Sequence, residues 1–180
     1  MAGLAVPHLF AQNLTLEGQT GGFITPTAYV VYSAKKQFFS YPAVGYHFIH
    51  VPKVIGDIHT FNIAESFGNR AEVGYTRSVH KNGNDPLFSS LWHYAGMNVF
   101  SGKVVAIRDG QGGPITPGLA AGFVVRTGDH FVSGALAPVV GAAPPGKTYT
   151  NEDVYAVVTK TWLHPPLPFL DNLGWTATNA

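Results

Sequence analysis

Apolar and polar residues alternate along much of the chain, and turn-forming residues separate the alternating runs. A period of two is typical of β-strands. Short connections between the runs predict a meander of antiparallel hairpins. We expect about nine strands, at Thr27–Tyr32, Pro42–His50, Ile58–Ser66, Arg70–Val79, Asn98–Ile107, Gly118–Thr127, His130–Ala137, Asp153–Trp162 and Phe169–Thr178.

Turns are expected where glycine, asparagine and proline gather, at Gly68-Asn69, at Asn82–Pro86 and at Asp109–Pro114. One short helix is an alternative to an aromatic strand or loop after the second of these turns. There Asp85 is a candidate cap, and Pro86 suits the first helical position.

The two faces of the expected strands differ in polarity. In Arg70–Val79 the more polar face carries Arg70, Glu72, Gly74, Thr76 and Ser78, and the other carries Ala71, Val73, Tyr75, Arg77 and Val79. An apolar strand face meets lipid in a membrane barrel and meets the core in a soluble sandwich. Periodicity alone does not decide between these two environments.

Composition narrows the function classes. Charged residues make up only 12% of the chain, against roughly a quarter in an average soluble domain. A net charge of +1 supplies no field that would collect nucleic acid, so no nucleic-acid partner is expected. With no cysteine, the chain has no disulfide, thiolate metal site or cysteine nucleophile.

Residues 1–11 look like the latter half of a secretory signal peptide, and residues 12–180 are expected to form a single β domain. The chain contains no run of about twenty apolar residues, so no transmembrane helix is expected. A membrane location therefore requires a β-barrel.

The stretch Leu16–Tyr29, with Gly-Gln-Thr-Gly before Pro-Thr-Ala, resembles the first strand of a group of poorly characterised bacterial outer-membrane β-barrel proteins. Further segments similar in style are Ala71–Arg77, Gly96–Lys103 and Asn151–Lys160. The resemblance implies an antiparallel up-and-down barrel whose partner is the outer-membrane lipid bilayer. Such barrels have an even strand number and usually end in a terminal aromatic residue. An odd count and the ending Gly174–Ala180 lead us to expect an incomplete barrel from a truncated member.

No pattern for catalysis or metal binding stands out, and neither an enzyme nor a cofactor is expected. The eight histidines form no compact metal motif, and His47 and His50 fall on opposite faces of a strand. Asp129-His130 with Ser133 lacks a nucleophile elbow. Asp109–Gly113 lacks the Lys-Ser/Thr pair of a phosphate loop and is expected to be a hairpin turn.

Four charged residues are candidates for the interior of a barrel, where water or a partner charge would meet them: Arg70, Glu72, Arg126 and Lys160. The first hypothesis is an outer-membrane barrel with a passive transport or structural role. The alternatives are a soluble exported β-sandwich that binds saccharides, and a hydrolase built on such a sandwich. The oligomeric state is left open by the sequence.

Overall fold

The computed structural model describes residues 13–33, 37–51, 53, 56–81, 83–84, 93–131 and 148–161, with the backbone alone for 93–95, 129–131 and 148–149. Five expectations lie wholly or largely outside these residues. They are the signal-like segment 1–11, the turn at Asn82–Pro86, the short helix after Asp85, the strand His130–Ala137 and the strand Phe169–Thr178.

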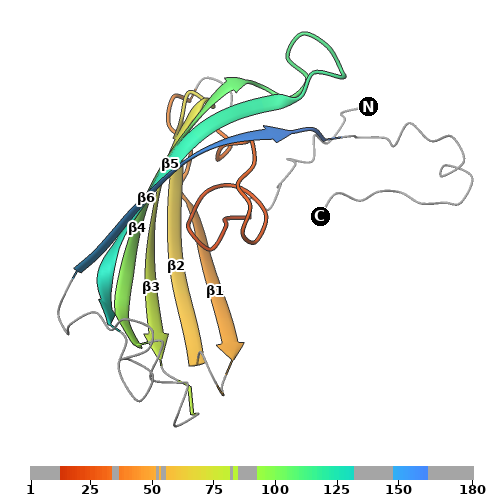
Figure 1. Ribbon diagram of the computed structural model, residues 1–180. Helices are drawn as coiled ribbons and strands as arrows, with labels where there is room; N and C mark the ends of the chain where they lie inside the picture. The colour runs from red at the N-terminus through yellow and green to blue at the C-terminus, as the bar shows by residue number, and fades with distance from the viewer. Residues whose placement is uncertain are drawn as a thin grey trace, which may run out of the picture.

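Six antiparallel strands form one open sheet, in the order in which they occur along the chain (Figure 1). The strands are β1 (Ala43–Val51), β2 (Gly56–Phe67), β3 (Ala71–Lys81), β4 (His93–Ile107), β5 (Gly118–Phe131) and β6 (Thr148–Thr159). The predictions of an all-β fold and an antiparallel meander are thus confirmed. In the described part of the chain, β1 and β6 are edge strands and the sheet is not closed.

The expected strands differ clearly from the observed ones in four places. The strand expected at Asn98–Ile107 begins earlier, at His93, and the one expected at Asp153–Trp162 spans Thr148–Thr159. Thr27–Tyr32 is not a strand, and this prediction was wrong. Its backbone N–H groups bind side chains of the sheet: Ala28 N donates to Thr159 Oγ1 and Val31 N to Glu72 Oε2. Gly118–Thr127 does not end at its expected boundary but continues to Phe131, because Gly128 pairs with Tyr149 of β6.

A tight turn joins β2 to β3. Gly68 and Asn69 have φ values of 58° and 54°, and Arg70 N donates to Phe67 O at 3.0 Å. Positive φ at both central residues is the backbone of a type I′ turn, whose twist matches that of the flanking strands. The predicted Gly68-Asn69 turn is confirmed, and Asn69 is one of the few residue types that tolerate this conformation.

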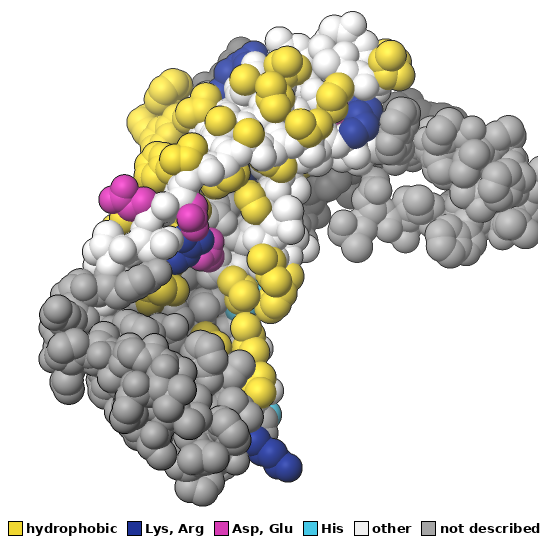
Figure 2. Space-filling model, in the orientation of Figure 1, with side chains coloured by type: hydrophobic (Ala, Val, Ile, Leu, Met, Phe, Trp, Pro, Cys, Tyr) yellow, Lys and Arg dark blue, Asp and Glu magenta, His cyan; other side chains and the backbone are white. Residues whose placement is uncertain are grey.

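The polarity of the sheet is opposite to that of a soluble sheet over a core. Its buried face is largely polar and carries Thr60, Asn62, Ser66, Glu72, Thr76, Ser101 and Lys103. The alternate positions carry exposed apolar side chains: Tyr46, Phe48, Phe61, Ile63, Val73, Tyr75, Phe100, Phe123 and Val154. Figure 2 shows apolar side chains spread over the surface of the sheet.

Residues 13–33, hereafter the N-terminal segment, lie on the concave side of the curved sheet (Figure 1). Two small apolar clusters join the segment to the sheet. Leu14 and Val31 pack with Ala64 of β2, and Ala28 packs with Val105 of β4 and Ala120 of β5. Small clusters of this size leave most of the contact between segment and sheet to polar groups.

Asn69 tests how the turn holds the N-terminal segment. Its side chain accepts from Ser33 N at 2.7 Å and donates to Ser33 O at 3.2 Å. We expect Asn69→Ala to lower the free energy of unfolding by about 2 kcal/mol, from lost hydrogen bonds and an unfavourable φ. Asn69→Gly removes only the hydrogen bonds and should cost about half as much. Urea titrations followed by circular dichroism measure both; equal losses would contradict the backbone contribution.

Candidate functional site

A buried ion pair lies at the centre of the polar face. Glu72 of β3 and Lys103 of β4 are directly opposite each other in the register, and Lys103 Nζ lies 3.2 Å from Glu72 Oε1. Their side chains are 2% and 0% exposed. Charges this deeply buried are tolerated only when each has an opposite charge and further hydrogen-bond partners.

The N-terminal segment supplies those partners through Thr20. Thr20 N donates to Glu72 Oε1 at 2.9 Å, and its hydroxyl lies 2.8 Å from Oε2. Lys103 Nζ in turn donates to Thr20 Oγ1 at 2.6 Å and to Thr20 O at 3.1 Å. Because Val31 N also reaches Glu72, the carboxylate binds the segment at two points. We call Glu72, Lys103 and Thr20 the central network.

A second charged group fixes the segment above β5. Arg126 forms two contacts with Glu17, one of them 2.7 Å from Nη2 to Oε2. The same guanidinium contacts Asn151 and Asp153 of β6. A planar guanidinium suits paired contacts of this kind. The side chain of Arg126 is 19% exposed, so this group lies nearer to solvent than the central network.

The segment approaches the sheet closely at a pair of glycines. Gly18 has a φ of 85°, and its carbonyl oxygen would lie 2.8 Å from a Cβ at Gly74 of β3. A side chain at position 74 would therefore push the segment away from the sheet. The first glycine of the Gly-Gln-Thr-Gly stretch is thus favoured by its positive φ, and the stretch is not a strand.

One rim of the sheet carries a clamp of polar groups, formed by Tyr29, Asp109, Lys160 and Thr161. Asp109 accepts from the Tyr29 hydroxyl and from Lys160 Nζ, both at 2.6 Å, and from Thr161 N at 3.0 Å. Burial raises the pKa of Asp109, but these donors outweigh it and hold the pKa below its ordinary value of 3.8. Burial, with the Asp109 carboxylate, raises the pKa of Tyr29.

The four charged residues singled out from the sequence fall into two groups. Glu72 and Arg126 lie on the concave face, in contact with the N-terminal segment. Arg70 is exposed beside the β2–β3 turn, and Lys160 lies in the clamp just after β6. Sequence reasoning missed Lys103 and Thr20. The one signal for Lys103 is a lone charge at an alternate position of an otherwise uncharged strand.

The other residues considered as catalytic or metal-binding candidates do not come together in a site among the described residues. His47 and His50 lie on opposite faces, with Phe23 beside His47 and Asp57 beside the exposed His50. Residues 109–113 form part of the β4–β5 hairpin connection, as predicted. The side chains of Asp129 and His130, and Ser133 altogether, lie outside the described residues. Among those described, no three potential ligands group around a metal position, and no helix is long and apolar enough to cross a membrane.

The central network predicts that removing a single charge lowers the stability of the fold strongly. Glu72→Gln leaves the ammonium of Lys103 buried without a counter-charge, and we expect it to cost about 3–5 kcal/mol of unfolding free energy. Glu72→Gln combined with Lys103→Met removes both charges and should be markedly milder. Proteolysis within residues 13–33 should increase in parallel with the loss of stability.

The control for this comparison is Asp57→Asn, which breaks the exposed pair with His50. Exposed pairs contribute little, so this variant should resemble the native protein in both measurements. A Glu72→Gln variant as stable as the control would contradict the role assigned to the central network.

Asp109 predicts a pH dependence. The pKa of Asp109 is lower in the folded chain than the ordinary 3.8. The ionised carboxylate therefore adds to the free energy of unfolding, and this contribution is complete above that pH. The contribution declines as the pH falls through the folded pKa. Asp109→Asn lacks it at every pH, so the stability difference between native protein and variant should shrink as the pH falls from about 5 toward 3. Urea titrations at a series of pH values measure the difference, and a gap that widens on acidification would contradict the assignment.

Comparison of the chain with protein-family models, with curated proteins and with solved structures gave no match. The resemblance to outer-membrane barrels therefore stays a prediction.

Proposed function

We propose that this protein is an outer-membrane β-barrel protein whose apolar sheet face contacts lipid and whose polar face encloses the N-terminal segment. The observation that carries the proposal is the reversed polarity of the sheet. Large apolar side chains such as Phe61, Phe123 and Val154 are 54%, 49% and 87% exposed, whereas Glu72 and Lys103 are buried. Apolar positions facing out and polar positions facing in are typical of membrane barrels.

A soluble saccharide-binding sandwich is less well supported by the same observation. A sandwich buries its apolar face between two sheets. In the described part of the chain no second sheet covers that face. A contiguous apolar surface of this extent favours contact with a membrane or another large apolar surface.

Closure of the sheet is part of the proposal. The backbone groups on the outer sides of β1 and β6 need hydrogen-bond partners in a bilayer, where no water supplies them. We infer that additional strands join these two edges to complete the barrel. The six described strands, of 9 to 15 residues each, are long enough to cross a bilayer when tilted.

The contents of the interior favour a structural role over an open pore. The N-terminal segment occupies the concave face and is bound by the central network and by Arg126. The polar side chains of this face, among them Asn62, Glu72 and Lys103, are buried where the segment lies against the sheet. We therefore propose a plugged barrel.

The proposal is tested by expressing the full chain with an export signal in a Gram-negative host. We expect it to fractionate with the outer membrane and to migrate faster on a gel when unheated, as folded barrels do. Conductance in planar bilayers should be low, because the interior is occupied. Recovery of a soluble periplasmic monomer would contradict the membrane location and redirect the search to glycan binding.

Introducing a charge on the apolar face distinguishes a lipid-facing sheet from a water-facing one. Val73 lies on β3 and is 49% exposed. In lipid, Val73→Arg should cost about 2–4 kcal/mol and reduce folding into phosphatidylcholine vesicles. In water the same change at an exposed position should cost no more than about 0.5 kcal/mol.

The matched control is Ile115→Arg, in the β4–β5 connection, where the side chain is 76% exposed. It adds the same charge outside the strands, so insertion should be unaffected. Equal insertion by the Val73 and Ile115 variants would argue against a lipid-facing sheet.

A further inference from the structure

Two arginines at one end of the sheet have no carboxylate partner among the described residues. Arg70 and Arg108, hereafter the arginine pair, are both exposed. Arg70 Nη1 donates to the carbonyls of Val105 and Ala106 at 3.2 and 3.1 Å. Arg108 Nη2 donates to Gly68 O at 3.1 Å. These neutral acceptors hold the guanidinium groups in place without neutralising them.

The two arginines lie close together, because the guanidinium of Arg108 binds the carbonyl of Gly68, two residues before Arg70. Gln111 Oε1 accepts from Arg108 N at 3.1 Å and lies 3.5 Å from Arg70 Nη2. The nearby carboxylate of Asp109 is already bound by Lys160 and Tyr29. Both positive charges, and the donors that the carbonyls leave unused, are therefore available to an anion.

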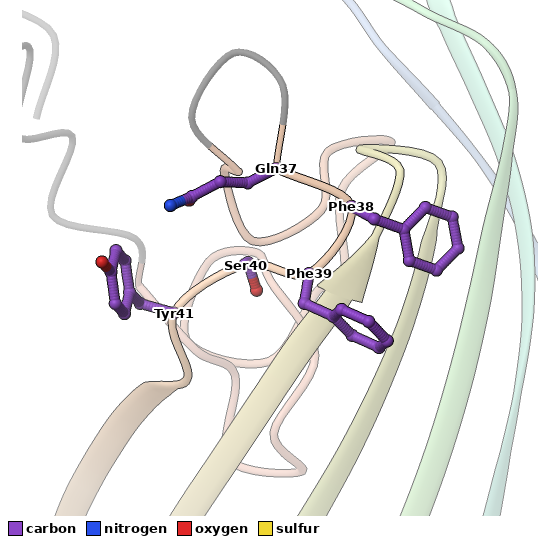
Figure 3. Close-up of a pocket in the computed structure, with 5 residues that line it drawn as sticks. All are labelled: Gln37, Phe38, Phe39, Ser40 and Tyr41. Carbon is purple, nitrogen blue, oxygen red and sulfur yellow. The ribbon is translucent and has the colours of Figure 1, made fainter.

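An aromatic cluster adjoins the arginine pair. Phe38, Phe39 and Phe67 have ring centroids 5.0 to 6.4 Å apart, and Phe38 and Phe39 are 64% and 58% exposed. Figure 3 shows the rings of Phe38 and Phe39 beside the end of β2, with Tyr41 on the other side of the stretch that contains residues 37–41. Gly68 joins the groups directly, because its N–H donates to Phe38 O and its carbonyl accepts from Arg108.

This combination occurs where the apolar sheet face ends. Val104 and Ile107 of β4, 57% and 39% exposed, lead up to the arginines. Figure 2 shows Lys and Arg side chains near the upper end of the sheet, next to apolar ones. Aromatic rings gather at the boundary between hydrocarbon and water in membrane barrels. Guanidinium groups bind phosphate oxygens through paired hydrogen bonds.

We propose that the arginine pair binds the phosphate of an anionic lipid headgroup, with the aromatic cluster against the upper part of the acyl chains. The inference rests on the proposed membrane location. A lipid is favoured over a free anion because the exposed rings and the apolar face below them provide a surface for acyl chains beside the cations.

The test uses the full chain folded in a neutral detergent and native mass spectrometry with added phosphatidylglycerol or phosphatidylcholine. The native protein should retain phosphatidylglycerol at least about fivefold more strongly than phosphatidylcholine. The double variant Arg70→Gln, Arg108→Gln should bind phosphatidylglycerol about tenfold more weakly, since each surface cation contributes substantially to the binding of anionic lipid. Equal retention of the two lipids by the native protein would overturn the inference.

Two controls separate charge at this site from other effects. Lys53→Gln with Lys81→Gln removes the same number of charges from the β1–β2 connection and the end of β3, and should leave lipid retention unchanged. Arg70→Lys with Arg108→Lys keeps the charges and should retain most of the binding. A loss as large in either control as in the glutamine variant would overturn the assignment to these two guanidiniums.

Two further outcomes distinguish this inference from the proposed function. Inorganic phosphate at the lipid concentration should not displace phosphatidylglycerol, and displacement would show a free-anion site instead. Heat-modifiable migration in phosphatidylcholine vesicles reports barrel formation independently of headgroup charge. A chain that folds there but lacks the lipid preference keeps the proposed function and overturns only this inference, whereas a chain that never folds into vesicles overturns both.

Discussion

The buried pair of Glu72 and Lys103 is the constraint on which the rest of the structure depends. Placing two charges where their side chains are almost wholly inaccessible is costly, and their mutual attraction offsets the cost only with further hydrogen bonds. The sheet alone does not provide enough of them. Thr20 and Val31 complete the set, so the N-terminal segment is an integral part of the folded unit.

The same constraint explains the irregular backbone of the N-terminal segment. A regular strand would direct the N–H groups of Thr20 and Val31 toward another strand, and here both donate to one carboxylate. This is why the pattern in Thr27–Tyr32, although it alternates as a strand does, produces no strand. A long-range polar interaction overrides local propensity in this segment.

Much of the sheet was predictable because it depends on local pattern. β1, β2 and β3 match the expected segments within two residues at each end, and the turn at Gly68-Asn69 has the residue types that its positive φ values demand. The contacts between the concave face and the N-terminal segment were less predictable. Thr20 is 52 residues from Glu72 and 83 from Lys103, and no local periodicity indicates that these groups meet. Glu72 and Arg126 were predicted as candidate charges of a barrel interior, but the groups that they contact were not predicted.

The alternation of apolar and polar residues also left open which face of the sheet is turned toward water. The contacts of the charged side chains favour the view that the polar face is the enclosed one. Inside the concave face each charge is paired, as at Glu72 and at Arg126, because solvent is scarce there. On the apolar face Gly102 lies under the ring of Phe123, which covers backbone that would otherwise be open. The proposed lipid contact fits this face, because fluid lipid imposes no shape and side chains as different as Val154, Phe123 and Tyr75 would serve equally well. A protein partner would demand a complementary surface, and a water-exposed sheet would favour polar residues at these positions.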